Sequence, residues 1–501
     1  MKNNMNERNR SENNKTEKST LLPQNLSVPQ YNNPAGDEYP VIAVNNYLFP
    51  NKTATTEEEI KDQVQTIKDC GFNVSMWICR GIDGLWRDQI STYYKVSNSL
   101  GLRTIYNLSN QVPVVKVKDY ELNKTQYEPT LDKIAEILNL NKGNDNLWGY
   151  NLADEPKYQE WAYTTPTAAV NNKDLLAMFR TYLQNANGHV ALFNLVAVVR
   201  EDEVGKEIYN SHGTNMAKYQ RYLRAIKYKF NPSLLSIDIY PITKSKSNTG
   251  PQYTILERYY YILEAVGNFS TQYDMPFWMY LLCNQFNSYN DDGSINAEFP
   301  KPTEGILRFQ ALTALAYGFQ ALVFWTYSLH TNNMKDNPNG GDKILVEEFL
   351  DAPYVEGHTT EIWDNCKAII PEIKQYGKEL LGAKFQGARH VYGPLSGDPY
   401  KETTKFESSI GCIVGASSNG QGFVITHLKK GNYNYMAIVS HNPDNMETIE
   451  ISIPLNCFWH EINYNHIDAN KGPSSVSMRY NGDVKILTRH LKPGGMILIR
   501  Y

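Results

Sequence analysis

The stretch Trp148-Gly-Tyr-Asn-Leu-Ala-Asp-Glu-Pro156 is an apolar run that stops at two adjacent carboxylates and a proline. Because proline cannot donate to a neighbouring strand, a strand over 147–152 has to end before it, with Asp154 and Glu155 at its C-terminal end. In a barrel of parallel strands, active sites are built at that end. The alternative is the first turn of a helix, where negative charge is favoured.

Strand-like and helix-like segments alternate on both sides of this stretch. Short β-branched runs indicate strands, and apolar residues three or four positions apart indicate helices. We predict strands at 41–47, 73–79, 103–108, 147–152, 190–197, 234–240, 276–283 and 321–327. We predict helices at 57–70, 83–100, 130–140, 173–185, 215–229, 253–273, 304–317 and 361–381. This order is that of a (β/α)8 TIM barrel, whereas a doubly wound sheet would need a Gly-rich turn after the first strand.

Composition divides the chain into three parts. Residues 1–36 are rich in Asn, Lys, Glu and Ser and lack an apolar core, which predicts a disordered or processed tail. The barrel is expected over 37–382. From 383 to 501, short alternating segments separated by turn residues predict a small all-β sandwich domain, which we interpret as structural.

The bulk numbers exclude several classes of partner. Hydrophobic residues make up 41% of the chain and charged residues 20%, as in ordinary globular proteins. The net charge of −4 gives no reason to expect nucleic acid or an anionic membrane as partner. No apolar run is long enough to span a membrane. The six cysteines include no C-x-x-C pair, so we predict no metal or redox site. Oligomeric state cannot be inferred.

Polar and aromatic residues gather at the predicted strand ends. Amides and carboxylates bind hydroxyl groups, and flat aromatic faces suit the C–H surface of a sugar ring. Histidines are missing from these ends and Gly-rich phosphate loops are scarce, so we predict no metal and no cofactor. The candidate site residues are Asn45, Arg80, Asn107, Asp154, Glu155, Asn194, Asp238, Tyr240, Asn284, Gln285, Trp325 and Tyr327.

Two carboxyl groups are the usual requirement for cleaving a glycosidic bond. We assign Glu155 as proton donor and favour Asp238, at the end of the sixth strand, as nucleophile or base; its alternative role is structural. Neighbours on a strand point in opposite directions, so Asp154 is expected to position a hydroxyl or raise the pKa of Glu155. Glu304 is better explained as a first-turn helix charge.

Two motifs carry a family resemblance. Asn151 to Pro156 resembles the Asn-Glu-Pro signature after the fourth strand of clan A glycoside hydrolases, with Asp154 where the clan has Asn and Glu155 as acid/base. Residues 306–318 and 321–327 are similar to the closing helix and eighth strand of family 42 β-galactosidases, which implies Trp325 on the sugar-binding face. The whole chain also resembles glycosidases of gut Bacteroidetes, which implies a periplasmic or secreted location.

The resemblance breaks at the seventh strand. Clan A enzymes carry a nucleophilic Glu there, and this chain has Asn284 or Gln285. The nucleophile then comes from Asp238 or Glu304, or the enzyme inverts through water, or the barrel binds glycan without cutting it. We expect a glycoside hydrolase acting on an oligosaccharide or polysaccharide of plant or host origin. The alternative is a catalytically inactive carbohydrate-binding barrel.

Overall fold

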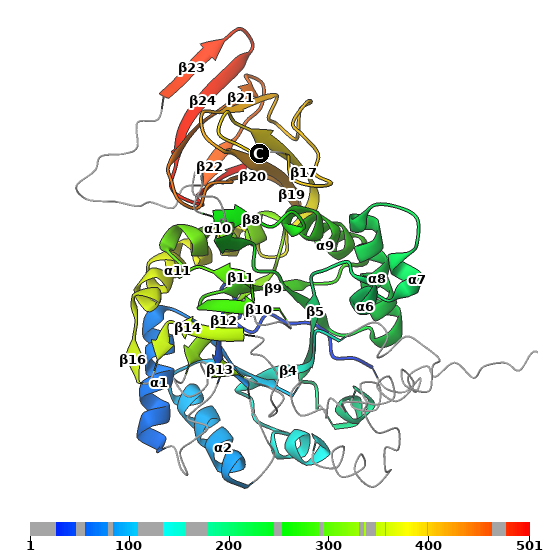
Figure 1. Cartoon of the computed structure of the whole chain (residues 1–501), viewed down its shortest axis with the longest axis vertical. Coiled ribbons are helices and arrows are strands. Elements are labelled where there is room, and N and C mark those ends of the chain that lie inside the picture. The colour runs from blue at the N-terminus through cyan, green and yellow to red at the C-terminus, as the bar shows by residue number, and fades with distance from the viewer. Residues whose placement is uncertain are drawn as a thin grey trace, which may run out of the picture.

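The structure is a computed structural model of the chain, in which a barrel carries a C-terminal β domain (Figure 1). It describes residues 27–46, 56–78, 84–108, 134–156, 179–185, 187–244, 253–290, 294–329, 335–336, 347–355, 357–397, 399–462 and 477–501. Among these residues, no helix combines the length and the apolar character needed to cross a membrane.

Eight parallel strands close into a barrel, because β1 pairs with both β2 and β12. The predicted TIM barrel is therefore confirmed. In order around the barrel, the strands are β1 (Val41–Asn46), β2 (Val74–Ile78), β3 (Arg103–Asn107), β4 (Leu147–Asp154), β5 (Val190–Val196), β6 (Leu234–Asp238), β9 (Phe277–Leu282) and β12 (Ala321–Leu329). Two short strands, β15 (Tyr354–Val355) and β16 (His358–Thr359), extend the sheet beyond β12.

Helices surround the barrel, as the alternation predicts. Residues 134–140 and 179–185 are also helical. The named helices are α1 (Glu57–Cys70), α2 (Gly84–Ser99), α6 (Glu201–Val204), α7 (Lys206–Tyr209), α8 (Asn215–Phe230), α9 (Tyr259–Tyr273), α10 (Glu304–Ala316) and α11 (Glu361–Leu380).

Helix α1 has the bounds that its end signals predict. Thr56 and Glu59 form a reciprocal capping box at its start. At its end, Gly71 adopts a left-handed conformation with φ of 102°, which glycine adopts without steric cost. Local signals alone therefore define this element.

Two segments differ from the prediction. The helix expected over 253–273 begins only at Tyr259, because β8 (Tyr253–Ile255) pairs with β7 (Ile242–Lys244) in a hairpin. Aromatic and β-branched residues favour this strand. The region between the strand predicted at 276–283 and the helix predicted at 304–317 forms β10 (Gln285–Tyr289) and β11 (Ile295–Phe299). These join β14 (Glu347–Asp351) and β13 (Lys335–Asp336) in an antiparallel sheet.

Aromatic side chains fill the barrel at the N-terminal ends of its strands, opposite the predicted site. Trp148 stacks on Trp278 with ring centroids 4.9 Å apart, and Tyr31 contacts both rings edge-on. Trp148 Nε1 donates to the backbone oxygen of Asn32 at 2.9 Å. Residues 27–36, which the sequence prediction included in the tail, thus supply part of this packing.

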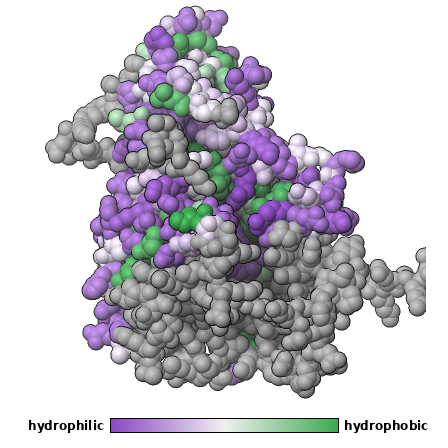
Figure 2. Space-filling model, in the orientation of Figure 1, coloured by the Kyte–Doolittle hydropathy of each residue, from purple (hydrophilic) through white to green (hydrophobic). Residues whose placement is uncertain are grey.

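The C-terminal domain is a sandwich of two antiparallel sheets, as predicted. Ile425, Ile438 and Ile451 are among the buried side chains between them. On the face seen in Figure 2, its surface is mainly hydrophilic with small, separate hydrophobic patches. One sheet contains β17 (Lys384–Tyr392), β19 (Gly422–Lys430), β20 (Tyr433–Ser440), β25 (Met496–Arg500) and β22 (His460–Ile462). The other contains β18 (Gly415–Ser418), β21 (Glu447–Pro454), β24 (Val484–Leu491) and β23 (Ser477–Asn481).

Candidate active site

The end of β4 departs from regular strand geometry. Its pairing with β5 shifts between Asn151 and Ala153, which places one extra residue in β4. Glu155 then adopts φ of 44°, a left-handed conformation that is uncommon for a residue with a Cβ. Its backbone N–H donates to the oxygen of Asn194 at 2.9 Å, which fixes this turn against β5. Glu155 therefore lies outside the strand alternation, and the rule of opposite directions does not apply to it.

Asn194 on β5 joins carboxylates from both neighbouring strands. Its Nδ2 donates to Asp154 Oδ1 at 2.9 Å and to Asp238 Oδ2 at 3.2 Å. Its Oδ1 accepts from Ser236 Oγ at 2.9 Å, which fixes the orientation of the amide. Asn194 is 1% exposed. One amide nitrogen thus holds two carboxyl groups at the open end of the barrel.

The carboxyl group of Glu155 lies beside that of Asp238. The pKa of Asp238 is raised well above its usual range, first by burial, then by the charges of Glu155 and Asp154, and also by a side-chain hydrogen bond with Glu155. Two ionised carboxylates have no proton to donate, so that hydrogen bond exists only when one of them is protonated. Asp238 Oδ1 is buried and has no hydrogen-bond partner among the described residues. The pair therefore holds a proton more readily than either acid alone.

Asp154 completes the group of three acids. Its side chain is open to solvent at the strand end. Even so, the protein surrounding this end of the barrel reduces its hydration and raises its pKa, an effect that the hydrogen bond from Asn194 partly offsets. Burial, and then the charges of Asp154 and Asp238, raise the pKa of Tyr280, which places this tyrosine near the same acids.

A cation lies near the acids, at a position that the sequence analysis does not include among the site residues. Arg258 precedes α9 and is half-buried. Burial lowers the pKa of its guanidinium, while the carboxylates of Asp238 and Glu155 act in the opposite direction. Its Nε has no hydrogen-bond partner in the described part of the chain. The sequence places this residue inside the helix predicted over 253–273, where an arginine is expected on the solvent face.

The end of the seventh barrel strand carries an amide where clan A has a carboxylate. Asn284 is fully buried, and neither polar atom of its side chain has a partner among the described residues. The side chain of Gln310 on α10 binds the backbone of Leu282, two residues earlier in the chain than Asn284. Gln310 Oε1 accepts from the Leu282 N–H at 3.0 Å, and Gln310 Nε2 donates to the Leu282 oxygen at 3.2 Å. The backbone oxygen of Trp325 accepts from Cys283 N–H at 2.7 Å, and the Trp325–Thr326 peptide bond is cis.

Two predicted substrate-binding residues do not reach the barrel mouth. Asn45 is fully buried and donates to Tyr93 OH at 3.2 Å while accepting from Gln63 Nε2 at 3.3 Å. These partners lie on α1 and α2, so Asn45 faces the helices. Tyr327 is also fully buried, donates to Thr66 Oγ1 at 2.9 Å and packs against aromatic rings behind the strand. The register shift between β1 and β12 falls between Phe324 and Ser328, so strand alternation misplaces the Tyr327 side chain.

The other predicted residues that the structure describes lie at strand ends or beyond them. Asn107 is buried at the end of β3, level with Asn151 of β4. Tyr240 packs edge-on against Phe286 of the antiparallel sheet. Gln285 begins β10 and pairs there with β14. Arg80 lies outside the described residues.

Glu304 has a structural role, as expected. It is the first residue of α10, after the N-cap residue Thr303, and its Oε2 forms an ion pair with Arg308 Nη2 at 3.1 Å. Arg308 also pairs with the buried Glu372 at 2.9 Å. These contacts account for the carboxylate without a role in chemistry.

The sequence prediction also missed two polar residues. Asn151 belongs to the opening motif and is fully buried, and neither atom of its amide has a partner in the described ranges. Ser236 is recognised only through its bond to Asn194. Nor do the described His, Cys, Asp and Glu side chains include a group of three placed to hold a metal ion.

No family model and no curated protein matches the sequence. Among solved structures, a β-galactosidase from Bacillus circulans sp. alkalophilus aligns with a TM-score of 0.51 at 9% identity, covering 93% of this chain and 99% of that one. Xylanase 10B from Thermotoga maritima aligns with a TM-score of 0.40 at 11% identity, over 68% of this chain and 96% of the xylanase. The first likeness establishes a shared fold, a (β/α)8 barrel followed by antiparallel sheets, as the resemblance in the sequence implies.

Proposed function

We propose that this protein is a glycoside hydrolase that cleaves O-glycosidic bonds of a plant or host glycan outside the cytoplasm. One observation carries the proposal: three carboxyl groups, Asp154, Glu155 and Asp238, meet around Asn194 at the C-terminal end of a parallel barrel. This is the end where barrel enzymes place their chemistry. A proton held between neighbouring acids is what protonation of a glycosidic oxygen requires.

In this proposal Glu155 is the general acid and Asp238 the second carboxylate. Glu155 gives its proton to the glycosidic oxygen as the bond to the anomeric carbon breaks, and Asp238 either bonds to that carbon or activates the water that does. Water finally supplies the hydroxyl group of the sugar product and the proton that restores the acid. A covalent route needs about 5 Å between the two carboxyl groups, and a water-mediated route about 6.5–9.5 Å. A hydrogen-bonded pair is closer than either. Because Glu155 lies beyond the last residue of β4, we infer that it moves away from Asp238 when a glycoside enters between them.

The test is a hydrolysis screen against aryl glycosides and plant polysaccharides, with the product anomer followed by NMR. It compares the wild type with Glu155→Gln and with a control, Glu361→Gln, which changes an exposed carboxylate at the start of α11. Hydrolysis by the wild type and the control, lost in Glu155→Gln, supports the proposal. The first-formed anomer then distinguishes Asp238 acting as nucleophile from Asp238 acting as base.

A second candidate is a carbohydrate-binding barrel without catalysis. The amide of Asn284 at the end of the seventh barrel strand favours it, since an amide cannot form the usual glycosyl-enzyme ester. Glycan binding by the wild type that survives Glu155→Gln, with no turnover of any substrate, would support this candidate over the hydrolase.

A further inference from the structure

A groove of about 520 Å³ lies where the barrel meets the C-terminal domain. Strand β8 and the turn after it form one wall, with Tyr253, Thr254 and Glu257. Residues 395–397 and 399–401, together with Tyr392, form the other wall from the C-terminal domain. Figure 1 shows β8 directly beneath that domain. The volume falls within the range of about 300–1,000 Å³ typical of small-molecule sites.

Hydrogen bonds fix the wall that the C-terminal domain contributes. Tyr392 OH accepts from the backbone N–H of Tyr400 at 3.0 Å, which closes the segment into a loop. The Glu402 carboxylate accepts from the backbone N–H groups of Asn215 and Met216, each at 2.9 Å. These N–H groups begin α8, so the loop is tied to the barrel itself. A wall held in this way loses little conformational freedom when it binds a ligand.

The barrel wall is fixed as well. Strand β8 pairs with β7, and the Leu256 N–H donates to the Pro241 oxygen at 2.9 Å. At the other end of the hairpin, Lys244 forms an ion pair with Glu298 of β11 at 3.0 Å. Both sides of the groove therefore have a defined shape.

The lining is chemically suited to an uncharged, hydroxyl-rich ligand. It combines tyrosine rings with hydroxyl and amide groups, and its charges are one glutamate, Glu257, and one lysine, Lys401. These opposite charges offset each other, which gives no attraction for a polyanion. Its aliphatic side chains, Leu395 and Ile255, offer too little apolar surface to bind an apolar peptide segment. Tyrosines carry both an apolar face and a hydroxyl, which is the combination that a neutral sugar contacts.

One turn of the chain connects the groove to the arginine that stands near the group of acids. Glu257 lines the groove, and the next residue, Arg258, interacts electrostatically with Asp238 and Glu155. We propose that the groove binds a second stretch of the same neutral glycan, so that the protein holds an oligosaccharide at the acids and at the domain boundary together. The choice of a glycan as ligand rests on the proposed function.

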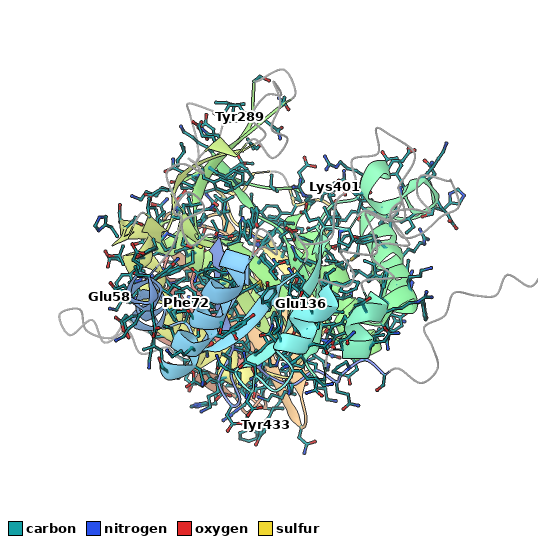
Figure 3. All side chains as sticks on the ribbon, turned by 90° about the horizontal axis from the view of Figure 1, so that it is seen from below. Glu58, Phe72, Glu136, Tyr289, Lys401 and Tyr433 are labelled. Carbon is teal, nitrogen blue, oxygen red and sulfur yellow. The ribbon has the colours of Figure 1, made fainter. Side chains whose placement is uncertain are left out.

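Calorimetric titration with xylohexaose, cellohexaose and β-1,4-galactohexaose tests this, in a Glu155→Gln background that prevents hydrolysis. Tyr253→Ala removes a ring from the groove, and Thr254→Trp fills it from the exposed edge strand. The control is Tyr433→Ala, an exposed tyrosine at the opposite edge of the view in Figure 3 from Lys401. We expect at least a tenfold weaker hexasaccharide affinity in both groove variants and an unchanged affinity in the control.

Hydrolysis of aryl monosaccharides is measured separately, in chains that retain Glu155. There we expect the groove variants to match the wild type, because a monosaccharide does not reach the groove. Equal hexasaccharide affinity in all variants, or no binding of any hexasaccharide, overturns the inference. If the wild type hydrolyses nothing while binding still depends on the groove, the proposed function fails and the groove site stands. Thermal melting of each variant confirms that it is folded.

Discussion

Asp238, the last residue of β6, shares a proton-dependent hydrogen bond with Glu155, which lies just beyond the end of β4. Strand β5 runs between these two strands, and its Asn194 holds Asp238 from the side. The contact depends on the left-handed turn at Glu155, with φ of 44°. A residue with a Cβ in this conformation costs about 1–3 kcal/mol, so other contacts of the fold have to maintain it.

The first prediction concerns the pH dependence of hydrolysis. Asp238→Asn removes a negative charge beside Glu155, so the pKa of the Glu155 carboxyl should fall. The alkaline limb of kcat/KM, which reports loss of the acid's proton, should therefore move to lower pH. We also expect activity to drop by about 100-fold or more if Asp238 is the second carboxylate. An alkaline limb that stays in place would show that the two acids titrate independently.

The same substitution should alter stability in a pH-dependent way. The pKa of Asp238 is raised in the folded protein above its ordinary value of 3.8. The stabilising contribution of such an acid is complete below that ordinary value and is lost as pH rises through the raised pKa. Asp238→Asn should therefore match the wild type near pH 3.5 and be more stable at pH 8, by about 1–3 kcal/mol. Denaturant unfolding at both pH values measures this.

Asp274→Asn, at an exposed carboxylate after α9, is the control for that experiment. It should show no comparable gain at pH 8. A wild type and Asp238→Asn variant that differ equally at both pH values would contradict a raised pKa. This readout does not depend on any enzymatic activity.

Arg258→Gln should move the alkaline limb in the opposite direction. The guanidinium favours the ionised forms of Asp238 and Glu155, and its loss should raise the pKa of the pair. The alkaline limb should then lie at higher pH than in the wild type. Arg479→Gln, which removes an exposed arginine paired with Glu450 in the C-terminal domain, is the matched control. Identical profiles for Arg258→Gln and the control would exclude an electrostatic role for Arg258.

The arrangement of strands could be predicted from sequence because its signal is periodic. Apolar runs, caps and the switch to short alternating segments gave the barrel and the sandwich, and for α1 even the terminal residues. Interruptions of the period could not be predicted. The extra residue in β4 and the turn at Glu155 bring together carboxylates that strand alternation would separate. The shift between β1 and β12 likewise places Tyr327 behind the barrel wall.

Site residues that act through a neighbouring side chain also could not be predicted from the sequence. Ser236 and Asn151 lie inside strands whose sequences are typical of buried core strands. Their roles depend on which side chain of the neighbouring strand lies next to them. Asn45 shows the converse. Its type and position at a strand end predicted ligand binding, yet its partners are the helices. A shift of one residue along a strand moves its side chains from one face of the sheet to the other. The sequence alone does not show where such a shift occurs.

Asn194→Ala tests the residue that joins the two strands. It removes the donor to Asp154 and Asp238 and leaves the Ser236 hydroxyl without its acceptor. Because these groups are partly buried, we expect a loss of about 1–3 kcal/mol in the free energy of unfolding. Without that donor both acids should titrate at higher pH, so the acidic limb of the activity profile, where Asp238 becomes ionised, should move to higher pH. A variant with wild-type stability and profile would show that the acids are positioned without Asn194.

The final prediction concerns the boundary between the domains. His390 Nδ1 and His441 Nε2 lie 3.2 Å apart, fully enclosed among tyrosine rings that include Tyr260 and Tyr400. Burial lowers the pKa of His390 to about 3. Burial, and then the neighbouring His390, lower the pKa of His441 well below its ordinary value of 6.5. The folded protein therefore keeps both rings neutral where an unfolded chain would protonate them.

Stability should fall as pH decreases from about 6.5 towards 3, because the unfolded chain binds protons that the folded chain excludes. Each histidine contributes a slope of up to about 1.4 kcal/mol per pH unit. His441→Asn removes one of these groups while keeping a polar neighbour for His390, so its melting temperature should decline less steeply between pH 6.5 and 4.5. His460→Asn, at an exposed position on β22, is the control and should follow the wild type. If His441→Asn declines as steeply as the control, the histidine pair does not couple the domain boundary to pH.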